Sequence, residues 1–405
     1  MDRRKAKTVD VFFSMLVLLI MSYFDILTLN SMLFGEGNIY DTTKDGLLIF
    51  IVVLLIISRK RLLVLKKDSV FVFIAISLLF FITLLISLAS TEVIIAEKLY
   101  RGVYFAFFGY ALIRKIKDYP VFFNVMTVFA SIMILYGCVI VYFVEIDKAY
   151  MGFAYALLVY VLFMNYNWLF RKSKVSAIFA VIGIIVELIG GARGAIICIT
   201  FFIGMFFITR IKRKRDLVII LAVLLVLPWL DSLLLLMNDL FSVLGVDSRT
   251  ISAIQGTGLE SLSYANGRIE ILEASIELIK ANPFGYGFLG ERAPLNNAIW
   301  WFTTNGYSHN IFVELVLQFG VVIGTFLGIV LVVTSIRIIR IGKFQLPYNG
   351  LFLVYLSYNL NLLVSRSYST SFQFWAMLSL MYMIIKQDSY DDNKQNRGVL
   401  KRNNE

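Results

Sequence analysis

The chain has 405 residues, 59% of them hydrophobic, and a mean hydropathy of +0.81. Soluble domains are typically about 45–50% apolar, so this composition excludes an ordinary soluble protein. The formal net charge of +11 does not indicate nucleic-acid binding, because the basic residues cluster in short segments between long apolar runs. Both cysteines, Cys138 and Cys198, lie inside such runs, so a disulfide framework is not expected.

Twelve apolar segments are predicted to cross a membrane as helices, since a hydrocarbon core about 30 Å thick needs roughly 20 apolar residues. In chain order they are residues 11–30, 44–58, 69–90, 97–113, 120–144, 150–169, 175–190, 194–209, 217–237, 309–335, 348–365 and 370–386. The expected fold is an all-α polytopic membrane protein with one transmembrane domain over residues 1–386. Residues 387–405 are polar and are expected to form a cytoplasmic tail without regular structure.

The basic residues predict the topology. With the N-terminus in the cytoplasm, 28 of the 38 Lys and Arg residues fall in cytoplasmic loops or in the two termini. The basic loops are residues 59–67, 114–117, 171–174, 210–215 and 337–343. Such an excess is what the positive-inside rule describes, so both termini are predicted to be cytoplasmic.

One loop on the outer side, residues 238–308, is much longer than the others, and long loops are usually functional. Within it a helix is predicted to begin after Asn266 and to stop at Asn282-Pro283. Its apolar residues recur at helical spacing, so we expect an amphipathic helix along the outer membrane interface. They are Ile269, Leu272, Ile276 and Ile279.

Few cations lie on the outer side, and four of them are candidates for binding phosphate. Arg193 lies in the tight turn IGGARGA, Arg268 begins the amphipathic helix, and Arg101 and Arg366 lie at the ends of spans. Arginine is planar, permanently charged and able to bind two phosphate oxygens at once. Together the four would suit a lipid-linked phosphate or pyrophosphate. Arg193 could instead extend from a hairpin turn to lipid phosphates, and Arg268 could lie on a solvated helix face. Arg101 and Arg366 could be interfacial anchors.

The only histidine, His309, lies in NGYSHNIFVELVLQFG, where the long loop meets an apolar run. Near neutral pH an imidazole can act as base or acid, or can hydrogen-bond a phosphate. Tyr307, Asn310 and Glu314 lie in the same stretch and are candidate substrate-binding residues. The alternative is that His309 only begins a helix. With one histidine and no Asp-rich motif, no metal site is expected.

The order of these features resembles the O-antigen polymerase and O-antigen ligase superfamily. The matching features are GGARGA, Asn266-Gly267-Arg268, the glycine-containing stretch 282–290, and His309-Asn310 opening an apolar helix with Glu314 and Gly320. Residues 285–290, GYGFLG, only approximate the usual glycine pattern.

This resemblance implies a GT-C-type glycosyltransferase fold and a metal-independent, cofactor-free transfer at the outer face of the bacterial cytoplasmic membrane. The donor and the acceptor would be polyprenyl-diphosphate-linked glycans, and the product an O-antigen or capsular polysaccharide. By position, Arg193 and Arg268 would hold the diphosphate, and His309 would orient or deprotonate the acceptor hydroxyl or contact the diphosphate. Arg101 and Arg366 would serve a second diphosphate site.

Two other functions remain open at this point. A ligase would move a finished polysaccharide to a different acceptor and would use the same residues. A secondary transporter or lipid-glycan flippase would usually show internal repeats and broken helices with charges near the midplane. Membrane lipids, a chain-length regulator and a flippase are the further candidate partners, and nucleic acid is not one.

Overall fold

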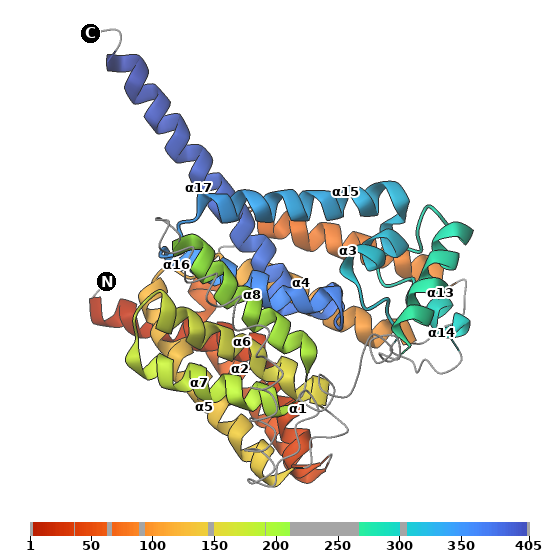
Figure 1. Ribbon diagram of the computed structural model, residues 1–405, viewed down its shortest axis with the longest axis horizontal. Helices are drawn as coiled ribbons and strands as arrows, with labels where there is room; N and C mark the ends of the chain where they lie inside the picture. Colours follow the sequence, from red (N-terminus) through yellow and green to blue (C-terminus); the bar gives the residue numbers. More distant parts are fainter. Residues whose placement is uncertain are drawn as a thin grey trace, which may run out of the picture.

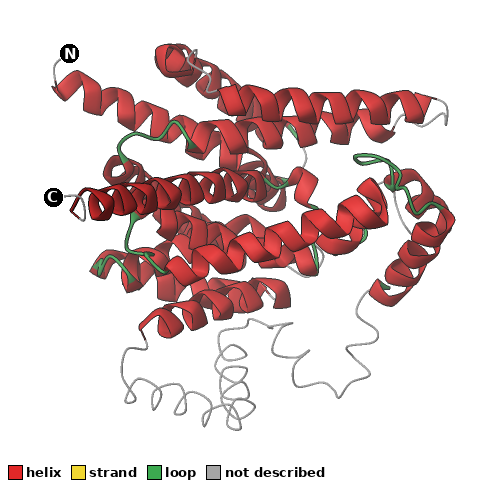
Figure 2. Cartoon of the chain, turned by 90° about the horizontal axis from the view of Figure 1, so that it is seen from above, coloured by secondary structure: helices red, strands yellow, loops and turns green. Residues whose placement is uncertain are grey.

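The computed structural model describes residues 3–35, 37–62, 67–88, 94–144, 150–190, 192–210, 267–299 and 306–402. Within these ranges all regular structure is helical, with 13 α-helices, two 3₁₀ helices and no strand (Figure 2). The all-α class predicted from the sequence is therefore confirmed for the described part of the chain.

The helices follow the predicted spans in order. The N-terminal eight are α1 (Arg3–Phe34), α2 (Asn38–Leu62), α3 (Lys67–Leu88), α4 (Ile94–Ile113), α5 (Tyr119–Phe143), α6 (Tyr150–Leu169), α7 (Lys174–Gly190) and α8 (Arg193–Arg210). The remainder are α13 (Arg268–Ala281), α14 (Arg292–Ala298), α15 (Ile311–Ile341), α16 (Pro347–Asn359), η3 (Leu360–Leu363), η4 (Tyr368–Thr370) and α17 (Phe372–Arg402). The predicted span 217–237 lies outside the described residues. Four described helices, α1, α5, α6 and α15, are long and apolar enough to cross a membrane.

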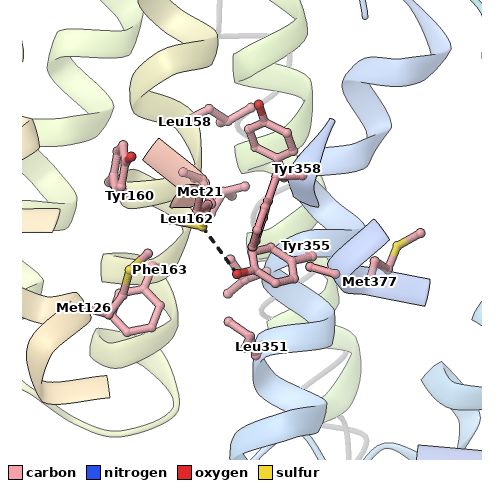
Figure 3. Close-up of a cluster of buried hydrophobic side chains, with 14 of the residues drawn as sticks. Met21, Met126, Leu158, Tyr160, Leu162, Phe163, Leu351, Tyr355, Tyr358 and Met377 are labelled. Atoms are coloured by element: carbon pink, nitrogen blue, oxygen red, sulfur yellow. Dashed lines mark hydrogen bonds between the residues drawn. The ribbon is translucent and has the colours of Figure 1, made fainter. Parts of the chain in front are cut away.

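Helix α6 forms the centre of the bundle. Every residue from 153 to 167 is buried, which is typical of a helix that is surrounded on all sides. Helices α1, α5, α7, α8 and α16 pack around it. In the core, the Tyr355 hydroxyl lies 3.5 Å from Met21 Sδ, so α16 and α1 also meet there (Figure 3).

The two chain ends lie at the opposite end of the bundle from α13 and α14 (Figure 1). Which of these two ends faces the cytoplasm stays a prediction of the basic residues. The expectation of an irregular tail is wrong, because α17 continues as a helix to Arg402. The tail contains no proline, and extending an existing helix avoids the cost of nucleating a new one.

Helix α15 is not one continuous span. Its backbone breaks at Gly320, where φ is 78° and ψ is 169°. Beyond the break, a Cβ placed on Gly324 would lie 2.6 Å from the α-carbon of Val316, and one on Gly328 would lie 3.0 Å from the Phe312 ring. Residues 311–319 therefore fold back along residues 321–341, and the prediction of an uninterrupted span at 309–335 is corrected.

This hairpin sets the depth of the site. Because Phe312 lies beside Gly328, the start of α15 is level with a point eight residues beyond the break. At a rise of 1.5 Å per residue, that level is about 12 Å along the helix from the turn. His309 and Asn310, which directly precede α15, are thus recessed from the end of the bundle at which α15 turns back at Gly320.

Helix α13 forms where the sequence predicts it, but it packs with a different face. Ile269, Leu272 and Ile276 are exposed, whereas Ile271 and Ser275 are buried. Ile271 belongs to a small apolar cluster with Leu295, Ile299 and Leu317. The exposed stripe is therefore available to the membrane interface while the opposite face holds α13 on the protein.

Candidate functional site

Three predicted site residues converge on Ser365, which lies between η3 and η4. The Arg268 guanidinium donates a hydrogen bond to the Ser365 hydroxyl at 3.2 Å, and the Tyr307 hydroxyl donates to the Ser365 carbonyl. His309 forms a hydrogen bond with the Ser365 backbone. Residues nearly a hundred positions apart in the sequence are thereby gathered around Ser365.

His309 is held in a defined position and is neutral. Its backbone adopts a left-handed φ of 53°, and its ring lies 4.1 Å from the Tyr307 ring, centre to centre. Burial, together with the positive charges of Arg268 and Arg292, lowers the pKa of His309 to about 4, and the hydrogen bond to the Ser365 backbone opposes this shift. The imidazole is therefore uncharged at neutral pH.

Arg366 lies close enough to Tyr307 to interact with it electrostatically. It donates a hydrogen bond to the Tyr358 hydroxyl, and its guanidinium carbon lies 5.4 Å from the centre of the Tyr155 ring. Asp25, buried in α1, interacts electrostatically with Arg366. The sequence reasoning missed Asp25, although a single carboxylate inside an apolar span is a signal of function.

The side chains of Arg193 and Arg101 lie outside the described residues, but the backbone beside each can be placed. A Cβ on Gly194 would collide with the Tyr155 hydroxyl, so the start of α8 adjoins the Tyr155–Arg366 pair. A Cβ on Gly102 would lie 3.5 Å from the Phe288 ring, so α4 adjoins the loop that precedes α14. The GGARGA turn therefore begins its helix next to the site.

Arg292 organises a buried polar network beneath these residues. Its guanidinium lies 3.0 Å from Glu291, 3.1 Å from Glu314 and 2.7 Å from the Ser367 hydroxyl. It also donates to the carbonyl of Gly306 at 3.2 Å. Arg292 was not among the site residues predicted from the sequence, although the adjacent Glu291 offered a possible ion-pair partner.

Two predicted substrate-binding residues have structural partners. Glu314 is fully buried and faces Arg292. Asn310 caps α15, because its side-chain oxygen accepts hydrogen bonds from the backbone of Phe312 at 3.0 Å and of Val313 at 3.4 Å. Its amide also donates to the Leu363 carbonyl at 3.4 Å. The helix-start role that the sequence left open for His309 thus falls to Asn310.

The glycine-containing stretch 282–290 fills the break in α15. The backbone N–H groups of Tyr286 and Gly287 donate to the carbonyls of Leu317 and Gln318, at 2.8 and 2.9 Å. In return, the N–H of Val321 donates to the Pro283 carbonyl at 2.9 Å. This close approach of two backbones requires glycine at both Gly285 and Gly320. A Cβ on Gly285 would collide with the backbone of Gln318 and Gly320, and a Cβ on Gly320 would collide with the backbone of Phe284.

The arrangement suits an anion. Among the described residues, Arg268 and Arg366 have no carboxylate within ion-pair distance, whereas Arg292 has two. The guanidinium groups of Arg268 and Arg366 can therefore bind phosphate oxygens. The neutral imidazole of His309 beside them can accept a proton. The described residues contain no group of three or more His, Cys, Asp or Glu that could hold a metal ion.

Comparison with known families gives one finding. The family model described as O-antigen ligase matches residues 178–328, from within α7 to the second segment of α15. The matched part contains Arg193, Arg268 and His309, whereas Arg366 lies beyond it. No curated protein and no solved structure matches the chain.

Proposed function

We propose that this chain, whose residues 178–328 match the O-antigen ligase family model, is a membrane enzyme that polymerises polyprenyl-diphosphate-linked repeat units. The transfer takes place at the outer face of the bacterial cytoplasmic membrane. The observation that carries the proposal is the convergence of Arg268, Arg366 and the neutral His309 around Tyr307.

In the proposed reaction, an acceptor sugar hydroxyl attacks the anomeric carbon of the donor glycan. The new bond joins the hydroxyl oxygen to that carbon, and the bond between the carbon and the diphosphate oxygen breaks. The electron pair leaves with the polyprenyl diphosphate, and the proton of the hydroxyl passes to the imidazole of His309. Arg268, with Arg193, stabilises the charge on the leaving diphosphate, as preorganised donors do in other enzymes.

Substrate binding would also adjust the basicity of His309. In the free protein, burial and the two arginines hold its pKa at about 4, which makes it a weak base. A bound diphosphate brings negative charge beside those arginines and so raises the pKa toward neutrality. An imidazole with a pKa near the working pH is the most effective general base. His309 would thus become a good proton acceptor only when the donor is bound.

Polymerisation is preferred because the site offers two separate cationic positions. Arg268 and Arg366 both act electrostatically on Tyr307 but have different partners, Ser365 and Tyr358. When donor and acceptor are the same kind of molecule, two diphosphates must be held at once. In this proposal Arg268 faces the donor and Arg366 the acceptor.

The test is a transfer assay with the purified full chain in nanodiscs and lipid-linked repeat units as the only glycan. A ladder of polymers that persists in EDTA and disappears in Arg193→Ala, Arg268→Ala and His309→Ala supports a metal-independent polymerase. Lys280→Ala is the matched control, because Lys280 is a strongly exposed cation on the same loop helix. If no polymer ladder forms but the glycan is transferred to a different added acceptor, the protein is a ligase and not a polymerase.

A further inference from the structure

A narrow apolar cavity lies directly inward of the candidate site. It has a volume of about 240 Å³ and is bounded by α8, α15, α16, η3 and α17. Of its described lining residues only Ser335 and Asn359 are polar. Such a lining accepts hydrocarbon and disfavours charged or strongly hydrated groups.

The outer end of this cavity meets the site. Its wall includes Ile311, which follows the cap residue Asn310, and Leu363, whose carbonyl accepts the hydrogen bond from Asn310. Leu363 is two residues before Ser365, the residue on which Arg268, Tyr307 and His309 converge. A molecule whose charged head lay at Arg268 could therefore place its apolar chain in the cavity beside Ile311 and Leu363.

The cavity runs along the membrane-crossing part of α15. Its wall extends from Leu331 to Ile339, which corresponds to about 12 Å of helix. Val332 and Ile336, which line it, are exposed, so this wall of the cavity reaches the lateral surface of the protein. A long chain can thus enter laterally and leave its remainder in the bilayer.

A second, larger cavity of about 400 Å³ lies on the other side of Leu331 and Phe374, which line both. Its lining includes Leu315 and Tyr368, and the Tyr368 hydroxyl donates to Gln318 of the buried Arg292 network. It therefore ends against groups that are already paired with one another. The smaller cavity is the one that reaches the edge of the site at Asn310.

We propose that the smaller cavity binds the first isoprenoid units of the diphosphate-linked lipid and so places the diphosphate beside Arg268 and His309. This inference rests on the proposed function, because it assumes that the substrate is a prenyl diphosphate. An acyl chain of a bilayer phospholipid has similar chemistry, but it has no diphosphate to hold at the adjacent arginine.

The experiment uses the full chain in phosphatidylcholine nanodiscs with a diazirine-bearing farnesyl diphosphate, and maps the cross-links by mass spectrometry. Ser335→Trp fills the cavity, and Val333→Trp, an exposed neighbour outside the lining, is the matched control. We expect cross-links within residues 331–339 or 360–363. Labelling should fall by about tenfold or more in Ser335→Trp and stay unchanged in Val333→Trp. If Ser335→Trp does not fold by thermal unfolding, Ile336→Trp takes its place.

Three results would overturn the proposal. One is equal labelling of Ser335→Trp and Val333→Trp, and another is cross-linking at Trp375 in the larger cavity. The third is labelling of the smaller cavity by a diazirine phosphatidylcholine that excess farnesyl diphosphate does not displace, which would assign it to bilayer lipid. The transfer assay is read separately. If the cavity is labelled but no polymer ladder forms, the polymerase function is rejected and the isoprenoid site is retained. If a polymer ladder forms but the cavity is not labelled, the isoprenoid site is rejected and the polymerase function is retained.

Discussion

Replacing Arg292 with methionine should lower the free energy of unfolding by about 3–5 kcal/mol, the range measured when one partner of a buried ion pair is removed. Arg292 is 4% exposed, and its loss would leave the carboxylates of Glu291 and Glu314 buried without their cation. The Ser367 hydroxyl and the Gly306 carbonyl would lose a hydrogen bond each. Burial raises the pKa of Glu291, so the penalty should shrink at acid pH, where the carboxyl is neutral.

The measurement is unfolding of the detergent-solubilised protein in a sodium dodecyl sulfate titration followed by tryptophan fluorescence. Lys280→Met is the control, because its ion pair with Glu277 is exposed and should be worth less than about 1 kcal/mol. In the double variant with Glu314→Gln, part of the lost stability should return, since one uncompensated carboxylate is removed. An Arg292→Met protein as stable as the Lys280→Met control would refute the reasoning that this network is a principal support of the site.

Three further outcomes can be measured on the same preparation. Arg268→Ala should reduce kcat of glycan transfer about 10²–10³-fold with an unchanged unfolding midpoint, and Arg268→Lys should recover part of the rate because lysine keeps the charge but not the bidentate geometry. The folded-state pKa of His309 of about 4 is below the ordinary value near 6.5. As the pH falls, the unfolded chain therefore binds the proton before the folded protein does, so the free energy of unfolding of the wild type should decrease between pH 6.5 and 4. The His309→Gln variant should not show this decrease. If the stability of both proteins changes with pH in the same way, the ring is not buried and neutral. Gly320→Ala should destabilise by about 1–3 kcal/mol because φ is 78° and a Cβ would lie 2.7 Å from the Phe284 backbone, whereas Gly46→Ala in α2, where a Cβ meets nothing within 4 Å, should not destabilise.

The sequence predicts the helices well because each span is a long apolar run bounded by charge. It also predicts α13 from Asn266 and Asn282-Pro283, although the residue that directly precedes the helix is Gly267. It does not predict the break at Gly320, because a glycine in an apolar helix is usually tolerated. Only the docking of Pro283 and Tyr286 from a separate loop decides that the helix opens there.

The site was predictable in its residue types and only partly in its contacts. Arg268 and His309 could be selected because cations and histidine are rare on the outer side. Ser365 could not, since a serine carries no such signal, and it joins Arg268 across 97 positions of sequence. The pairing of Arg292 with Glu314 depends on the fold-back of residues 311–319, which only the tertiary structure reveals.

The hairpin in α15 also bears on how the protein is assembled during insertion into the membrane. The carbonyls of Leu317 and Gln318 are bonded by the loop 283–287 rather than by the next turn of their own helix. In hydrocarbon an unbonded carbonyl is costly, so before that loop docks the nascent segment 311–341 is better satisfied as one straight helix. His309 would then lie at the outer end of that helix, away from its recessed position. We therefore expect the recessed site to form only when residues 283–287 dock against residues 317–321.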